Sequence, residues 1–257
     1  MTMIVFIDFD GTLFSHSTEC VPESTKKAID ELRKKGILVF LCTGRAAVEL
    51  KQFDLTGVNL DGMVLNNGQI VVDSNNEIIY SRPIEGRLKD VLLDLFHEKR
   101  ISIYLVLKDD MVLNFINSKI AEVQDSVSSP IPQVGEYSGE DFYMGTAVVQ
   151  NEQELNEILS LKNIAEVTFW HEGAIDIVPL GMTKSFGIDE VLRIYGIDLS
   201  ETMAFGDGQN DIDMLKHCHI GIAMGNSTDE VKIVSDYVTD DIDEDGLYNA
   251  LVYYGLL

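Results

Sequence analysis

Short apolar runs of strand length alternate with helical patterns in the first third of the chain and again in its last third. Alternation of this kind is typical of βαβ units, in which helices cover both faces of a parallel sheet. We therefore predict a doubly wound, Rossmann-like α/β core to which both ends of the chain contribute. Its predicted strands are Met3–Ile7, Ile37–Cys42, Met63–Leu65, Thr202–Phe205, Ile220–Ala223 and Tyr237–Val238, and its predicted helices are Glu23–Lys35, Lys184–Tyr195 and Asp211–Lys216.

The middle of the chain has a different pattern, because neighbouring strands there are joined by tight turns and must be antiparallel. We predict an α+β cap domain, residues 83–181, inserted into a core made of residues 1–82 and 182–257. The elements expected in the insert are helices at Glu85–Arg100, Ser118–Val127 and Glu152–Leu161, a strand at Gly145–Gln150, a hairpin of Ile101–Leu107 with Met111–Phe115, and a hairpin of Glu166–Trp170 with Ala174–Val178 whose turn is His171-Glu172-Gly173.

Composition narrows the classes of partner. The formal net charge of −24 argues against nucleic acid, because a binding face for it needs clustered Lys and Arg. No stretch approaches the roughly 18 apolar residues that span a bilayer, and no basic segment precedes the first apolar run, unlike in a signal peptide. Cys20, Cys42 and Cys218 lie far apart, in no metal-ligand spacing. We expect a cytoplasmic protein that binds neither nucleic acid nor membrane; its oligomeric state stays open, and a monomer is compatible with the sequence.

Acidic residues and glycine follow three of the predicted core strands. In an open parallel sheet, ligands bind beyond the carboxyl ends of the strands. Four carboxylates crowded at that edge repel one another unless a cation binds or a proton is shared. Oxygen ligands without His or Cys suit a hard cation, and Mg²⁺ is the one we expect. The three segments are Asp8-Phe9-Asp10-Gly11-Thr12, Thr43-Gly44-Arg45 and Gly206-Asp207-Gly208-Gln209-Asn210-Asp211.

A Mg²⁺ ion held by carboxylates usually accompanies a phosphate group. Thr43 offers a hydroxyl and Gly44 an unhindered N–H for phosphate oxygens, and Lys184 offers a point charge at the start of a helix that Thr183 can cap. Each feature alone is commonly a turn or a solvated lysine. Their occurrence together, each at a strand end or a helix start, indicates phosphate chemistry.

These residues resemble the haloacid dehalogenase superfamily of phosphohydrolases, in its class IIB, Cof-like branch, over essentially the whole chain. The predicted insert is similar in position and element order to the α+β cap of that branch. Gln69 and Ser227 depart from the branch, which commonly has alanine at both positions. The similar segments are Asp8–Thr12, Thr43, Asn67-Gly68, Met182-Thr183-Lys184-Ser185, Gly206–Asp211, Ala223-Met224-Gly225-Asn226 and Asp245-Gly246-Leu247.

The resemblance implies Mg²⁺-dependent hydrolysis of small phosphate monoesters, sugar phosphates or similar metabolites, through an aspartyl-phosphate. It makes Asp8 the nucleophile and Asp10 the general acid and base, a choice that spacing alone leaves open. The implied metal ligands are the Asp8 carboxylate, the Asp10 main-chain carbonyl and Asp207, with Asp211 acting indirectly or as a direct ligand. The implied phosphate-binding residues are Thr43, Gly44, Lys184 and Asn210.

Two other functions are compatible with the same motifs. A phosphomutase uses the same core to move a phosphoryl group between hydroxyls of its substrate. A sugar-phosphate-binding regulator would bind without turnover, but binding alone does not require the acid of the Asp8/Asp10 pair. Hydrolysis is therefore the main prediction.

Overall fold

The computed structural model describes residues 3–257, which form two compact units. We call the first the core unit; it contains the described residues up to 44, then 53–81 and 183–257. The second, the cap unit, contains residues 45–52 and 82–182. The short segment that follows Gly44 therefore groups with the insert, although it lies well before it in the sequence.

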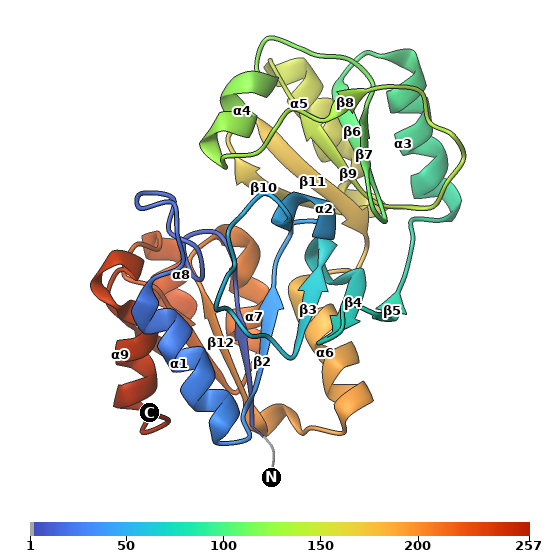
Figure 1. Ribbon diagram of the computed structural model, residues 1–257. Helices are drawn as coiled ribbons and strands as arrows, with labels where there is room; N and C mark the ends of the chain where they lie inside the picture. The colour runs from blue at the N-terminus through green and yellow to red at the C-terminus, as the bar shows by residue number, and fades with distance from the viewer. Residues whose placement is uncertain (1–2) are drawn as a thin grey trace. The chain divides into compact units, whose positions relative to one another are not determined.

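Within residues 3–257, the core unit is built on one eight-stranded sheet with the order β14-β13-β12-β1-β2-β3-β4-β5 (Figure 1). Strands β14 to β3 are parallel, as the α/β pattern predicts, whereas β3, β4 and β5 pair antiparallel. The antiparallel extension at this edge was not predicted. The strands are β1 (Ile4–Ile7), β2 (Leu38–Cys42), β3 (Gly62–Leu65), β4 (Ile70–Asp73), β5 (Ile78–Ser81), β12 (Thr202–Gly206), β13 (Ile220–Ala223) and β14 (Tyr237–Val238).

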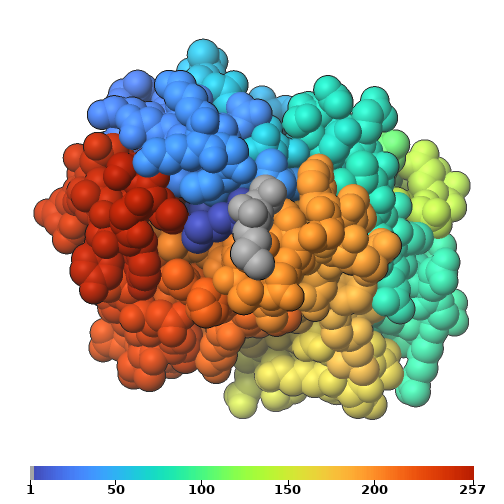
Figure 2. Space-filling view, turned by 90° about the horizontal axis from the view of Figure 1, so that it is seen from below, coloured from blue at the N-terminus to red at the C-terminus, as the bar shows by residue number. Residues whose placement is uncertain are grey.

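Helices cover the core sheet, which explains why its strands β1 and β2 are apolar at every position. Ile4 and Phe6 pack in one cluster with residues of α6 (Lys184–Tyr195) and α7 (Ile212–His217). The alternate strand residues are also buried, so the opposite face is covered as well. Helix α1 (Glu23–Lys34) contacts β2 and lies beside the C-terminal segment in the space-filling view (Figure 2). The other helices of the core unit are α8 (Asp229–Val234) and α9 (Gly246–Tyr253), with 3₁₀ turns at η1 (Asn66–Gly68), η3 (Leu199–Glu201), η4 (Gln209–Asp211) and η5 (Ile242–Glu244).

The cap unit has a six-stranded sheet, within the described residues, with the order β10-β11-β9-β6-β7-β8. Its pairs are antiparallel except β7 with β8, and the side chains of α3 and α5 complete one hydrophobic core with it. The elements are α2 (Ala47–Leu50), α3 (Gly86–Glu98), β6 (Ser102–Leu107), β7 (Met111–Leu113), α4 (Ile120–Ser126), β8 (Gln133–Val134), β9 (Phe142–Val148), α5 (Glu152–Leu159), η2 (Ser160–Asn163), β10 (Ala165–His171) and β11 (Ala174–Pro179).

Several predicted boundaries in the cap unit are wrong: β7 ends at Leu113 and not at Phe115, β9 ends at Val148 and not at Gln150, and α4 is shorter than the predicted Ser118–Val127. His171 was assigned to a turn, but it ends β10 and pairs with Ala174, so the turn is Glu172-Gly173 alone. Strand β9 starts at Phe142, before the predicted Gly145, because Phe142 and Met144 pair with Leu107 and Val106 of β6. The α/β fold with parallel core strands is confirmed. Within residues 3–257, no helix is both long enough and apolar enough to cross a membrane.

Candidate active site

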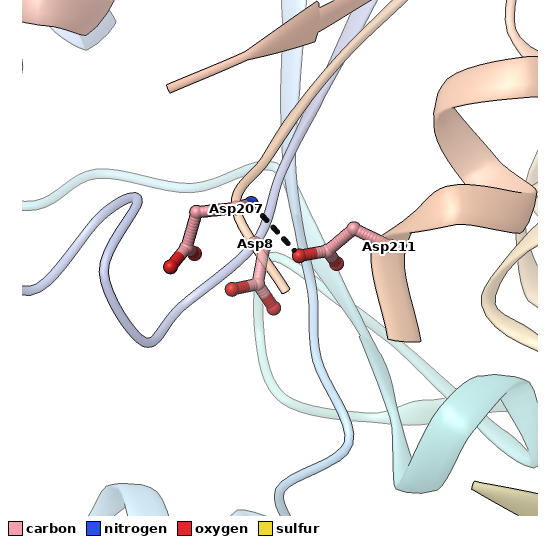
Figure 3. A group of neighbouring side chains, drawn as sticks. All are labelled: Asp8, Asp207 and Asp211. Carbon is pink, nitrogen blue, oxygen red and sulfur yellow. Dashed lines mark hydrogen bonds between the residues drawn. The ribbon is translucent and has the colours of Figure 1, made fainter. Parts of the chain in front are cut away.

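Three aspartates meet at the carboxyl edge of the core sheet. Asp8 follows β1 and Asp207 follows β12, and these strands are parallel neighbours with Ile7 opposite Phe205. The Asp8 N–H continues the pairing by donating to the Phe205 carbonyl at 3.0 Å. Asp211 comes from η4, and carboxylate oxygens of the three aspartates all lie within 4.8 Å of one another (Figure 3).

Two glycines allow this crowding. Gly11 has a φ of +75°, which favours glycine, and a Cβ there would lie 2.4 Å from Asp207 Oδ2. A Cβ at Gly206 would lie 2.5 Å from the Asp211 Cβ. The glycines of the two acidic motifs are therefore needed to bring the acids together.

Lys184 is buried and lies between two of the acids. Its Nζ donates to Asp8 Oδ1 and to Asp211 Oδ1, at 2.5 Å each. Thr183 accepts a hydrogen bond from the Phe186 N–H at 3.5 Å and so caps helix α6, as predicted. Burial lowers the pKa of Lys184, but the carboxylates of Asp211 and Asp8 outweigh burial and raise it above its usual range. The lysine is therefore a fixed cation.

Asp211 uses both of its oxygens within the core unit. Oδ1 accepts from Lys184, and Oδ2 accepts from the N–H groups of Asp207 and Gly208 at 3.0 and 2.8 Å. Asp211 thus fixes the loop that presents Asp207 and the lysine that contacts Asp8.

The electrostatics of this cluster favour a bound cation. Three ionised carboxylates and one ammonium group would leave two negative charges in excess. Burial, and then the charge of Asp211, raise the pKa of Asp8 well above its usual range. The same two causes raise the pKa of Asp207 to about 7, although a hydrogen bond from Thr12 Oγ1 at 2.9 Å acts in the opposite direction. An oxygen donor set with this charge fits a hard divalent cation.

The predicted phosphate-binding residues lie at the same edge of the sheet. Thr43 is buried directly after β2, whose Leu41 is opposite Ile7 of β1, and its N–H donates to the Val64 carbonyl at 2.9 Å. Gly44 packs closely against Asn67, since a Cβ at Gly44 would lie 3.0 Å from Asn67 Oδ1. Strand register therefore brings this loop next to Asp8.

Asn210 lies in η4, between Asp207 and Asp211 in the chain. Its Oδ1 is near Gly208, at 2.6 Å from the position that a Cβ would occupy there. The structure therefore places Asn210 in the acidic loop. Its phosphate-binding role stays a prediction.

Asp10 and three further residues complete the site. The Asp10 side chain is about one-third exposed (34%), and its Oδ1 lies 2.7 Å from His16 Nε2. Asn226 Nδ2 donates to the Gly11 carbonyl at 2.8 Å and approaches Asp207 Oδ2 at 3.4 Å. Thr12 and Asn226 lie in segments that resemble the family, but the sequence predicted no role for either residue. Nothing in the sequence indicated that His16 contacts the site.

Comparisons with known proteins agree with this geometry. A family model described as haloacid dehalogenase-like hydrolase matches residues 5–251. YkrA of Bacillus subtilis (strain 168) is 31% identical over 257 residues, with 99% of this chain and 98% of that protein covered.

Solved structures of other proteins are also similar over the whole chain, BT1666 and BT4131 among them. BT1666 from Bacteroides thetaiotaomicron, described among phosphatases of the superfamily, gives a TM-score of 0.89 at 30% identity and covers 100% of this chain and 96% of its own. BT4131, described as a subclass IIB sugar phosphatase, gives 0.86 at 31% identity and covers 100% of both chains. The resemblance inferred from the motifs is confirmed.

Proposed function

The chain belongs to the haloacid dehalogenase-like hydrolases and is a phosphatase, and we propose that it hydrolyses small phosphate monoesters through an aspartyl-phosphate on Asp8. The observation that carries this proposal is the cluster of Asp8, Asp207 and Asp211 around the buried Lys184. Sugar phosphates are the substrate class we favour, because BT4131 is described as a sugar phosphatase.

The donor set supports Mg²⁺ as the cofactor. The Asp8 carboxylate, the Asp207 carboxylate and the Asp10 main-chain carbonyl would hold the ion. Asp211 would act indirectly, through the Asp207 and Gly208 N–H groups and Lys184 that it holds, or would bind the ion directly. When bound, Mg²⁺ supplies charge neutralisation for the acids and for the phosphate oxygens.

The chain's own residues then perform two displacements. The Asp8 carboxylate attacks phosphorus and forms an acyl-phosphate bond, while the ester P–O bond breaks and the leaving oxygen takes a proton from Asp10. Asp10, now a carboxylate, removes a proton from water as the water oxygen attacks phosphorus and the bond to Asp8 breaks. Thr43, Gly44, Lys184 and Asn210 hold the non-bridging phosphate oxygens.

We assign residues 83–181 as the cap that determines substrate specificity, and residues 1–82 and 182–257 as the catalytic core. The cap unit also contains the segment after Gly44, which hydrogen bonds tie to the insert: Arg45 Nη1 donates to Ser129 Oγ at 2.7 Å, and Gln52 Nε2 donates to the same oxygen at 3.0 Å. The segment next to the Thr43-Gly44 loop therefore belongs to the unit assigned to substrate choice.

A screen of phosphorylated metabolites, with Mg²⁺ and with EDTA, tests the proposal directly. We expect Mg²⁺-dependent release of inorganic phosphate, with sugar phosphates ranking high in kcat/KM. Isomerisation of a sugar phosphate without free phosphate would indicate a phosphomutase. Saturable binding without turnover would indicate a regulator, and either result would overturn the hydrolase assignment.

A further inference from the structure

His16 contacts the side chain that we assign as the general acid. Its Nε2 lies 2.7 Å from Asp10 Oδ1, and 28% of the His16 side chain is exposed. The ring packs edge-on against Phe14, with centroids 5.4 Å apart, and against Phe53, at 6.5 Å. Because two aromatic rings hold the imidazole, its direction toward Asp10 is set by packing as well as by the hydrogen bond.

The loop that carries His16 is anchored on both sides of it. Ser15 Oγ donates to Asp243 Oδ1 at 2.6 Å, and Ser17 Oγ donates to the other oxygen of Asp243. Ser15 and Cys20 also exchange backbone hydrogen bonds, at 2.9 and 3.2 Å. His16 is thus held between two anchored serines and is not on a free loop tip.

The surroundings of the ring select one tautomer. Within the part of the chain that the structure describes, Nδ1 is buried and has no hydrogen-bond partner. A proton on Nδ1 would be an unpaired buried donor, which is costly. The neutral ring therefore carries its proton on Nε2 and donates it to Asp10 Oδ1.

We propose that His16 is a positioning residue that fixes which oxygen of Asp10 delivers the proton to the leaving group. With Oδ1 accepting from His16, the acid proton of Asp10 is confined to Oδ2, and rotation of the carboxyl group is restricted. The inference rests on the proposed hydrolysis and on the role of Asp10 in it. It assigns His16 an effect on leaving-group protonation, which a merely structural ring would not have.

The test compares two leaving groups in His16→Phe, which keeps the aromatic packing and removes both nitrogens. An alkyl phosphate such as a sugar phosphate needs protonation of its leaving oxygen, whereas 4-nitrophenyl phosphate does not. The ratio kcat/KM reports the steps up to departure of the leaving group. We expect His16→Phe to lower kcat/KM about tenfold for the alkyl ester, the size of one well-formed hydrogen bond, and much less for the aryl ester.

Two further variants isolate the hydrogen bond. His16→Gln keeps an N–H donor at a reach similar to Nε2 and is expected to restore most of the alkyl-to-aryl ratio. His217→Phe is the matched control, because His217 Nε2 contacts Asp189 Oδ1 at the same 2.7 Å in a pair between α7 and α6. We expect His217→Phe to leave kcat/KM for the alkyl ester, relative to kcat/KM for the aryl ester, unchanged.

The outcomes separate this inference from the proposed function. Equal losses for both esters in His16→Phe would show a structural role and overturn the inference, as would a His16→Gln variant that matches His16→Phe. A wild-type enzyme that releases phosphate from neither ester would instead refute the hydrolase assignment.

Discussion

Replacing an acid of the proposed metal site should stabilise the protein when no metal is present. Asp207→Asn removes a carboxylate that burial and Asp211 disfavour, and the new side chain has nearly the same shape. Its amide oxygen can still accept the hydrogen bond from Thr12 Oγ1, which now spans 2.9 Å. The substitution therefore isolates the charge.

The magnitude follows from the raised pKa of Asp207. In the folded protein that pKa is about 7, against an ordinary value of 3.8. Between these two values the folded state keeps the Asp207 proton, whereas the unfolded state has lost it. The stability that the protonated carboxyl group contributes is therefore fully present below about pH 4 and is lost as the pH rises through about 7. At about 1.4 kcal/mol per pKa unit, ionisation lowers the free energy of unfolding by about 4 kcal/mol at pH 8.

Urea unfolding in EDTA, at about pH 5 and about pH 8, measures this effect. We expect Asp207→Asn to be more stable than wild type, by about 2 kcal/mol at the lower pH and about 4 kcal/mol at the higher one. Mg²⁺ should reverse the order, because only wild type has the carboxylate to bind it. Asp109→Asn, at an exposed turn of the cap unit, is the control and should change stability by less than about 0.5 kcal/mol. A variant no more stable than wild type, or a difference independent of pH, would refute the reasoning.

Three other substitutions test the remaining parts of the site. Thr12→Val removes the donor to Asp207 and should weaken Mg²⁺ activation by about 10- to 100-fold in a metal titration of activity; an unchanged titration would show that this hydrogen bond does not orient the ligand. Lys184→Met leaves two buried carboxylates without their cation and should lower the free energy of unfolding in EDTA by about 3–5 kcal/mol, with a loss below about 1 kcal/mol counting against a buried ion pair. Asp10→Asn should keep Mg²⁺ binding, measured by calorimetry, and lose turnover by about 10²- to 10⁴-fold; near-normal turnover would contradict its acid–base role.

The sequence was most informative where burial alone determines structure. Strands β1 and β2, at the centre of the core sheet, are apolar at every position because both faces of the sheet are covered, so they were readily predicted. Strand β5 was missed because it lies at the sheet edge and its residues are partly or fully exposed. A strand with one partner and one open edge has no strong hydrophobic pattern. Strand β4 was missed although it has a partner on each side and three buried apolar residues, so its pattern was overlooked.

The candidate site was also predicted only in part. The acids were predicted because the segments that carry them directly follow strands, and parallel strands bring their carboxyl ends to one edge. Contacts that depend on how a loop folds back had no such signal: His16 reaches Asp10 only through the anchored loop after Gly11, and Asn226 reaches Asp207 from the end of another strand. Which acids Lys184 contacts likewise depended on the position of α6, which spacing does not encode.

The central claim is that the carboxylate of Asp8 accepts the phosphoryl group, and chemical trapping tests it most directly. Asp10→Asn should accumulate the intermediate from 4-nitrophenyl phosphate, because the leaving group departs without an acid while the general base for hydrolysis is missing. Borohydride reduction of an acyl phosphate on aspartate gives homoserine, which peptide mass spectrometry locates. We predict homoserine at position 8, dependent on both Mg²⁺ and substrate. Phosphate release with no reduced residue at position 8, or with the reduced residue elsewhere, would contradict the account.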